Sequence, residues 1–260
     1  MTALRTNVTG LLARARRGRA EPPVGSHAEQ LAALSPVDRG IVERCLPYTM
    51  TGVARLQAVI DAVRYLERRG MPGGFAECGV WRGGSVLAMI ETLRDLGAAP
   101  RPIWLYDTFE GMTEPTEADV SRFEPSPVET WRAAQARGQR PWSDLFDGQV
   151  FNEDAVRALL AETGYPIDML HFVRGPVEDT LPARLPSEPL ALLRLDTDWY
   201  ESTRHEMAHL YPRLVAGGVL IIDDYGHFEG ARRAVDEYFA DRDGPLLNRI
   251  DYTGRIAVKA

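Results

Sequence analysis

Two short apolar runs, each followed by a pair of acids, constrain the fold of this chain more than any other feature. Residues 190–198 read Leu-Ala-Leu-Leu-Arg-Leu-Asp-Thr-Asp, and residues 218–225 read Gly-Val-Leu-Ile-Ile-Asp-Asp-Tyr. Such runs are typical of parallel strands buried on both faces, and α/β sheets hold ligands at the carboxyl ends of these strands. A helical segment over about 199–214 separates the two runs. We therefore expect a β-α-β unit that brings two neighbouring strand ends to one edge of a sheet.

The acids that close the two runs predict a cation site at that edge. Asp196 and Asp198 follow the first run, and Asp223 and Asp224 follow the second. Carboxylates that crowd together repel one another unless a positive group lies between them. Oxygen ligands from a few acids suit a hard cation such as Mg²⁺. The alternative interpretation is that these acids cap helices and end solvated loops.

Strands and helices alternate along most of the chain, which predicts an α/β fold with a doubly wound, mostly parallel sheet. The fold divides into a helical cap segment over 1–50 and one domain over 51–260, with a lid-like insertion over about 108–168. Strands are expected over about 75–80, 102–107, 169–174, 190–196 and 218–223, with an antiparallel hairpin over 247–258. Helices are expected over about 51–70, 84–96, 128–137, 153–163 and 199–214.

The loop after the first strand predicts the cofactor. Residues 77–85 read Glu-Cys-Gly-Val-Trp-Arg-Gly-Gly-Ser, and Trp81 stands where a dinucleotide motif has its middle glycine. The glycines allow a ligand close to the backbone, and the helix N-terminus favours a carboxylate. The acid beside the loop suits an amino group, and Asp107 at the end of the second strand suits ribose hydroxyls. An amine, a carboxylate and a ribose together indicate S-adenosylmethionine.

Charge and hydropathy exclude several classes of partner. The formal net charge of −7 argues against a nucleic-acid partner, which requires a basic surface. No apolar stretch reaches the ~18 residues that a membrane span needs. The N-terminus lacks the apolar core of a signal peptide. We therefore expect a cytoplasmic enzyme with no membrane partner, and the apolar residues of the N-terminal helices favour a homodimer.

Four segments give the chain a resemblance to a known family. They are Phe75–Ser85, Leu105–Met112, Leu195–Thr203 and Ile221–Gly226. Together they resemble the macrocin O-methyltransferase (TylF-type) family, whose members are class I methyltransferases of antibiotic tailoring that act mostly on deoxysugar hydroxyls. The strand-end acids also resemble those of the catechol O-methyltransferases. Thr197 departs from the family pattern, in which a smaller residue is expected between the two acids.

The resemblance implies which residues hold S-adenosylmethionine. It places Glu77 and Gly79 against the methionine part and Ser85 against the carboxylate. It also assigns the ribose to Asp107, as the strand-end position already indicates. The remaining implied contacts are Met50 and Thr51, which close over the carboxylate, and Val177 and Glu178, which meet the adenine.

The resemblance also implies the residues of the chemical step. It assigns Mg²⁺ to Asp196, Asp223 and Asp224. A bound cation lowers the pKa of an acceptor hydroxyl, and a nearby carboxylate then takes the proton. Asp196 is the first choice for this base. Asp198 is the second choice, because it is also placed to cap the following helix. His227 is expected either to orient the acceptor or act as a second base, or to serve only as a loop residue.

These features predict an O-methyltransferase that depends on S-adenosylmethionine and Mg²⁺. Its predicted acceptor is a sugar hydroxyl of a glycosylated natural product, in antibiotic biosynthesis. The alternative within enzymes is a phenol or catechol O-methyltransferase, which uses the same acidic edge. A Rossmann-type oxidoreductase is disfavoured by Trp81, and a non-catalytic binding module is disfavoured by the intact strand-end acids.

Overall fold

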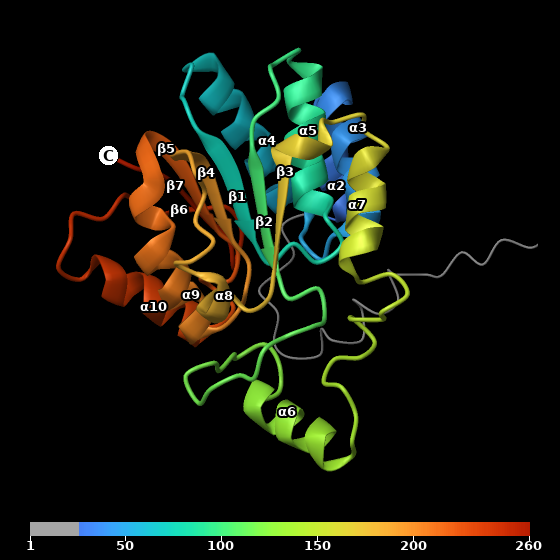
Figure 1. Ribbon diagram of the computed structural model, residues 1–260, viewed down its shortest axis with the longest axis vertical. Coiled ribbons are helices and arrows are strands. Elements are labelled where there is room, and N and C mark those ends of the chain that lie inside the picture. The colour runs from blue at the N-terminus through green and yellow to red at the C-terminus, as the bar shows by residue number, and fades with distance from the viewer. Residues whose placement is uncertain (1–25) are drawn as a thin grey trace, which may run out of the picture.

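The computed structural model describes residues 26–260, which form a seven-stranded sheet with helices on both faces (Figure 1). The strand order is β3-β2-β1-β4-β5-β7-β6. Neighbouring strands from β3 to β5 pair in parallel, whereas β7 runs antiparallel to β5 and to β6. The predicted fold class and hairpin are confirmed. The strands are β1 (Gly74–Cys78), β2 (Ile103–Asp107), β3 (Leu170–Arg174), β4 (Leu190–Leu195), β5 (Leu214–Ile222), β6 (Asn248–Arg249) and β7 (Arg255–Val258).

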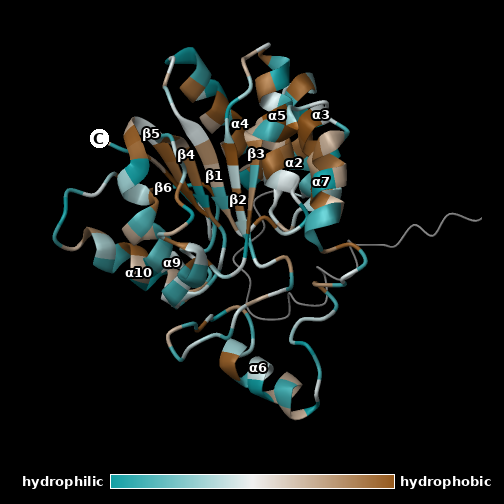
Figure 2. Ribbon diagram, in the orientation of Figure 1, coloured by the Kyte–Doolittle hydropathy of each residue, from teal (hydrophilic) through white to brown (hydrophobic). Residues whose placement is uncertain are grey.

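Helices divide between the two faces of the sheet and enclose two hydrophobic cores. In β1, Phe75 packs in the core that holds α4 and α5, while Ala76 packs in the opposite core with α9. Figure 2 shows the apolar residues gathered on the strands and on the inner sides of the helices. The first face carries α3 (Pro36–Cys45), α4 (Val53–Arg68), α5 (Gly84–Asp95) and α7 (Glu153–Ala161), preceded in the chain by α2 (His27–Ala32). The second face carries α8 (Val177–Thr180), α9 (Tyr200–His209), η3 (Tyr211–Arg213) and α10 (Glu229–Phe239).

The helix predicted over 51–70 shows how the sequence pattern becomes packing. The apolar stripe of α4 includes Leu56, Ile60 and Val63, which are fully buried. Burying one such side chain contributes about 1.5–3 kcal/mol, so the stripe fixes the face that α4 presents to the sheet. The short 3₁₀ turns are η1 (Leu46–Tyr48) before α4 and η2 (Ile167–Met169) before β3.

The strand order reverses between β1 and β4, and this reversal places the ligand site. The chain leaves β1 toward α5 on one face and leaves β4 toward α9 on the other. In open α/β sheets, ligands bind in the crevice at the carboxyl ends of the strands where the order reverses. The glycine loop after β1 and the acids after β4 and β5 all lie at this edge.

The predicted insertion has two structurally different parts. Figure 1 shows α6 (Pro127–Ala136) standing apart from the sheet, whereas α7 packs against it through Val156 and Leu160. The first part is tied to α9, because the Tyr200 backbone N–H donates to Asp119 Oδ1 at 2.6 Å. The part of the insertion that stands apart from the sheet is therefore the segment before α7, and its role as a lid stays a prediction. The part of the predicted cap segment before Ser26 lies outside the described residues. No helix within residues 26–260 is long and apolar enough to cross a membrane.

Candidate functional site

Three of the four predicted strand-end acids form one cluster. Carboxylate oxygens of Asp196, Asp198 and Asp224 lie within 4.8 Å of one another. The Asp198 backbone N–H donates to Asp224 Oδ2 at 3.2 Å, which ties the loop after β4 to the end of β5. Asp198 does not cap α9, because that role falls to Asp119. We call Asp196, Asp198 and Asp224 the acid trio.

The surroundings of the acid trio disfavour the charged form of its carboxyl groups. Burial and the neighbouring Asp223 and Asp224 raise the pKa of Asp196 well above its ordinary value, although Arg194 contacts it at 2.8 Å. Burial and Asp196 raise the pKa of Asp198 to about 8. Burial and Asp198 likewise raise the pKa of Asp224 well above its ordinary value. A divalent cation among these oxygens would relieve this repulsion.

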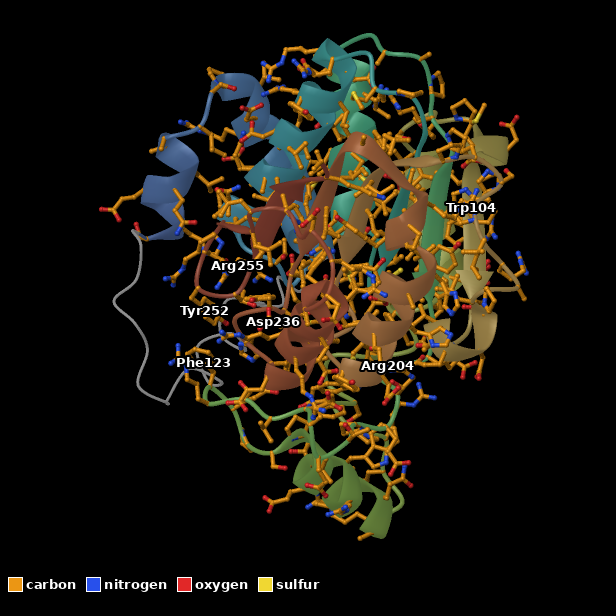
Figure 3. All side chains as sticks on the ribbon, turned by 90° about the vertical axis from the view of Figure 1, so that its left-hand side faces the viewer. Trp104, Phe123, Arg204, Asp236, Tyr252 and Arg255 are labelled. Atoms are coloured by element: carbon orange, nitrogen blue, oxygen red, sulfur yellow. The ribbon has the colours of Figure 1, made fainter. Side chains whose placement is uncertain are left out.

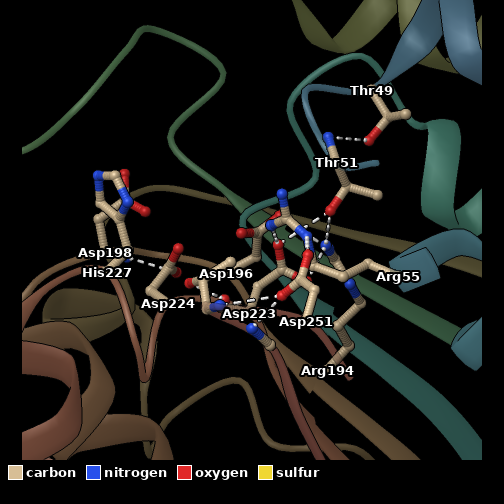
Figure 4. A network of polar contacts seen from close by, with 12 residues as sticks. Thr49, Thr51, Arg55, Arg194, Asp196, Asp198, Asp223, Asp224, His227 and Asp251 are labelled. Atoms are coloured by element: carbon tan, nitrogen blue, oxygen red, sulfur yellow. Dashed lines mark hydrogen bonds and ion pairs between the residues drawn. The ribbon is translucent and has the colours of Figure 1, made fainter. Parts of the chain in front are cut away.

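Asp223 points away from the acid trio into a network of arginines (Figure 4). It forms ion pairs with Arg55 and with Arg194, the latter at 2.8 Å, and accepts a hydrogen bond from the Thr51 hydroxyl at 2.9 Å. Burial opposes ionisation, but Arg194 and Arg55 hold the pKa of Asp223 below its ordinary value. The charge of Asp223 is therefore already balanced by the two arginines. For this reason Asp198 suits a cation better than the predicted Asp223.

Asp107 organises the glycine loop as well as ending β2. Its Oδ2 accepts the backbone N–H groups of Val80 at 2.7 Å and Trp81 at 2.8 Å, and its Oδ1 accepts that of Phe109 at 2.7 Å. Trp81 and Phe109 both have positive φ, at 49° and 53°. Such a conformation persists where surrounding contacts fix it. Asp107 therefore fixes the loop against which the predicted ribose would lie.

The glycine loop contacts the acid trio through its backbone. Gly79 has φ +81, and a Cβ there would overlap the carbonyl oxygen of Asp196. Glu77, expected to face the methionine part of the cofactor, is fully buried and forms an ion pair with Arg194. Ser85 is buried at the start of α5. The predicted cofactor loop and the predicted cation site thus form one connected unit.

The remaining predicted cofactor residues lie in different environments. Met50 is 43% exposed, whereas Thr51 is buried against Asp223. Val177 is buried at the start of α8, directly after β3. Glu178 Oε2 is buried without a hydrogen-bond partner, and burial raises the pKa of this carboxyl. An unsatisfied buried acceptor is the kind of group that a donor on a bound ligand would pair with.

An aromatic cluster that the motifs did not indicate lies near the acid trio. The His227 ring nitrogen Nδ1 lies 2.9 Å from the Tyr252 hydroxyl, and the Phe123 ring centroid lies 5.3 Å from that of His227. Figure 3 shows Phe123 and Tyr252 on the same side of the molecule. The His227 backbone N–H donates to the Asp224 carbonyl oxygen at 2.9 Å, which joins this cluster to the acidic edge.

The sequence patterns did not indicate two arginines of the site, Arg194 and Arg55. Arg194 interrupts an otherwise apolar run, and a charged residue inside a buried strand signals a buried ion pair. Arg55 reaches Asp223 from α4, and no local sequence pattern predicts this contact.

Comparisons with known proteins agree with this architecture. The profile of the family described as Macrocin-O-methyltransferase (TylF) matches residues 36–257. A Streptomyces olivaceus 8-demethyl-8-(2,3-dimethoxy-alpha-L-rhamnosyl)-tetracenomycin-C 4'-O-methyltransferase is 37% identical over 191 residues, covering 74% of this chain and 67% of that relative. Demethyldecarbamoylnovobiocin O-methyltransferase of Streptomyces niveus is 31% identical over 215 residues, covering 78% of this chain and 76% of the relative. The solved structure of the O-methyltransferase NovP matches with a TM-score of 0.67 and 31% identity, covering 82% of each chain.

Proposed function

The chain belongs to the macrocin O-methyltransferase (TylF) family, and from this premise we propose a substrate, a methyl donor and a metal for it. The proposed reaction is methyl transfer from S-adenosylmethionine to a sugar hydroxyl of a glycosylated natural product, with Mg²⁺ at the acid trio. One observation carries the proposal: the acid trio lies directly against the glycine loop, at the point where the strand order reverses. The tetracenomycin relative supports the sugar acceptor, since its name specifies a rhamnosyl compound.

The residues of the loop side fit S-adenosylmethionine. The unpaired Glu178 Oε2 suits the adenine amino group, and buried Val177 offers an apolar surface beside it. Ser85 stands at the N-terminus of α5, where a carboxylate is favoured. Asp107 stands at the end of β2, where a ribose is expected. The roles of Met50, Thr51, Glu77 and Gly79 in holding the cofactor stay predictions.

The acid trio fits Mg²⁺. Three carboxylates at one point supply the hard oxygen ligands that this cation prefers, and water completes its shell. Asp223 would lie outside this ligand set and would not bind the cation. Its ion pairs with Arg55 and Arg194 fix the end of β5, from which Asp224 projects.

The chemistry is divided between the bound groups and the chain. S-adenosylmethionine supplies an electrophilic methyl group, and Mg²⁺ lowers the pKa of a hydroxyl that it holds. Asp196 or Asp198 is proposed to accept the hydroxyl proton, at a carboxylate oxygen that the cation does not hold. Without the cation both carboxyls resist ionisation, since burial raises the pKa of Asp196 and of Asp198. Asp196 as first choice for the base and Asp198 as second choice stay predictions.

The aromatic cluster is proposed to orient the acceptor. Phe123, His227 and Tyr252 present flat rings beside the acidic edge, and such rings pack against the apolar face of a sugar or an aglycone. Correct orientation of two reactants supplies several kcal/mol of rate enhancement. The homodimer and the cytoplasmic location expected from the sequence stay predictions.

An acceptor panel tests the proposal. The full chain would be incubated with S-adenosylmethionine, Mg²⁺ and either glycosides or catechols, and methylated products would be identified by mass spectrometry. Transfer to glycosides, lost in Asp224→Asn and kept in the exposed-acid control Asp154→Asn, is the expected result. Transfer to catechols alone would contradict the sugar assignment. No transfer to any acceptor, with the cofactor bound, would favour a binding module.

A further inference from the structure

The turn that carries Asp198 has an unusual backbone. Asp198 has φ +67, a conformation that side-chain-bearing residues seldom adopt. Two backbone bonds support it: Asp198 N–H donates to Asp224 Oδ2, and Trp199 N–H donates to the Thr197 carbonyl oxygen at 2.8 Å. Strained turns persist where the surroundings over-determine them. A further contact reaches this turn from α9.

That contact comes from a buried carboxyl. The Thr197 hydroxyl donates to Glu206 Oε1 at 2.9 Å. Glu206 belongs to α9 and is fully buried; its Oε2 accepts no hydrogen bond from a nitrogen or oxygen donor, and the weak donor beside the carboxyl is the Cys78 thiol. Burial raises the pKa of Glu206 well above its ordinary value and so favours the neutral carboxyl.

Stability alone does not account for Glu206. A buried carboxyl with one unsatisfied oxygen is unfavourable compared with an apolar side chain of similar size. Its neighbour on α9, Met207, is fully buried and apolar, which shows what this core accepts. The hydrogen bond of Glu206 goes to Thr197, the residue that directly precedes Asp198 in the turn.

We propose that Thr197 and Glu206 act as a positioning pair for Asp198. Their hydrogen bond holds the turn so that the Asp198 carboxylate faces Asp196 and Asp224 and completes the acid trio. Neither member of the pair needs to touch the cation or the acceptor. The inference rests on the proposed metal site and names the residues that shape it. Groups of this kind commonly change metal affinity 10–100-fold when they are removed.

Paired variants test the proposal on the full-length chain. Thr197→Val and Glu206→Leu remove the bond, whereas Thr197→Ser and Glu206→Gln keep it. Thr92→Val is the matched control, because the Thr92 hydroxyl is also buried but donates to the Ala88 carbonyl oxygen within α5. Mn²⁺ alone is the probe, and its dissociation constant is measured by electron paramagnetic resonance. Calorimetry with S-adenosylhomocysteine and thermal unfolding report on the cofactor side and on folding.

The expected pattern separates positioning from general damage. Thr197→Val and Glu206→Leu should each weaken Mn²⁺ binding about 10-fold or more, with S-adenosylhomocysteine binding unchanged. The double variant should be no weaker than the worse single variant, because both changes break the same bond. Thr197→Ser, Glu206→Gln and Thr92→Val should bind Mn²⁺ like the wild type.

Different results would overturn the inference in distinguishable ways. A folded Thr197→Val that binds Mn²⁺ as tightly as the wild type refutes the positioning pair but leaves the metal site standing. Equal losses in the bond-keeping variants Thr197→Ser and Glu206→Gln also refute it, and they do so even where Thr197→Val does not fold. A wild-type chain that binds S-adenosylhomocysteine but no Mn²⁺ refutes the proposed metal site itself, and the inference with it.

Discussion

Replacing Asp107 with asparagine removes one of the two oxygens that hold the glycine loop. An amide oxygen turned toward Val80 and Trp81 keeps two of the three backbone hydrogen bonds, and the amide NH₂ then faces the Phe109 N–H. One donor left without a partner costs about 1–3 kcal/mol. The two remaining bonds also lose the gain from a charged acceptor, about 1 kcal/mol each.

Burial of the charge offsets part of this loss, because it raises the pKa of Asp107 and so disfavours the carboxylate. We therefore expect Asp107→Asn to lower the free energy of unfolding by about 2–4 kcal/mol, in the absence of any cofactor. Urea unfolding monitored by circular dichroism measures this quantity. Calorimetry should show weaker S-adenosylhomocysteine binding as well, since the loop that receives the cofactor is displaced.

An unchanged free energy of unfolding with weaker cofactor binding would refute the loop-clamp argument and leave only a ribose contact. Unchanged values in both assays would refute both roles of Asp107. Asp179→Asn is a suitable control, because Asp179 is an exposed acid in the first turn of α8 and its side chain is not part of the glycine loop.

Three further changes probe the acidic edge. Asp224→Asn should abolish Mg²⁺-stimulated turnover with cofactor binding intact; equal loss of both would assign the acid to the cofactor pocket or to folding. Without metal, Asp198→Asn should stabilise the protein increasingly between about pH 4 and about pH 8, since the wild-type carboxyl resists ionisation in the folded state. The gain is at most about 1.4 kcal/mol per pH unit, and a pH-independent difference in urea unfolding would contradict it. Gly79→Ala should impair Mn²⁺ and S-adenosylhomocysteine binding together, whereas Gly97→Ala, with positive φ but open space at its Cβ, should impair neither.

The sequence predicts the sheet and its ligand edge well because both follow from periodicity. The helix expected over 51–70 is α4, and the strand expected over 190–196 is β4. The runs ending in acids place those acids at one edge, and the structure brings three of them together. These features depend on local pattern and on the short connection between neighbouring strands, which the chain itself displays.

The acid trio differs from the predicted Mg²⁺ ligand set in one residue, with Asp198 in place of Asp223. Successive side chains at a strand end point to opposite sides, so Asp223 and Asp224 face different surroundings. Asp196 and Asp198 are two residues apart and remain on the same side. Alternation along β5 is thus the signal that separates Asp223 from the acid trio.

Other parts of the site depend on contacts that no local pattern contains. Arg55 reaches Asp223 across 168 positions of the chain, and Asp119 caps α9 from the insertion. Such pairings arise only once the helices have packed on the sheet. The same is true of the Thr197–Glu206 hydrogen bond, since the residues meet through the packing of α9 under the turn.

Methyl transfer measured before and after metal removal tests the central claim most directly. The full chain, with S-adenosylmethionine and a glycoside that it methylates, would be treated with EDTA and then supplied again with Mg²⁺. Loss of transfer in EDTA, recovery with Mg²⁺, and unchanged S-adenosylmethionine binding throughout are the results expected if the acid trio holds the cation. Full transfer in EDTA would contradict the metal site and leave the acid trio with proton transfer alone.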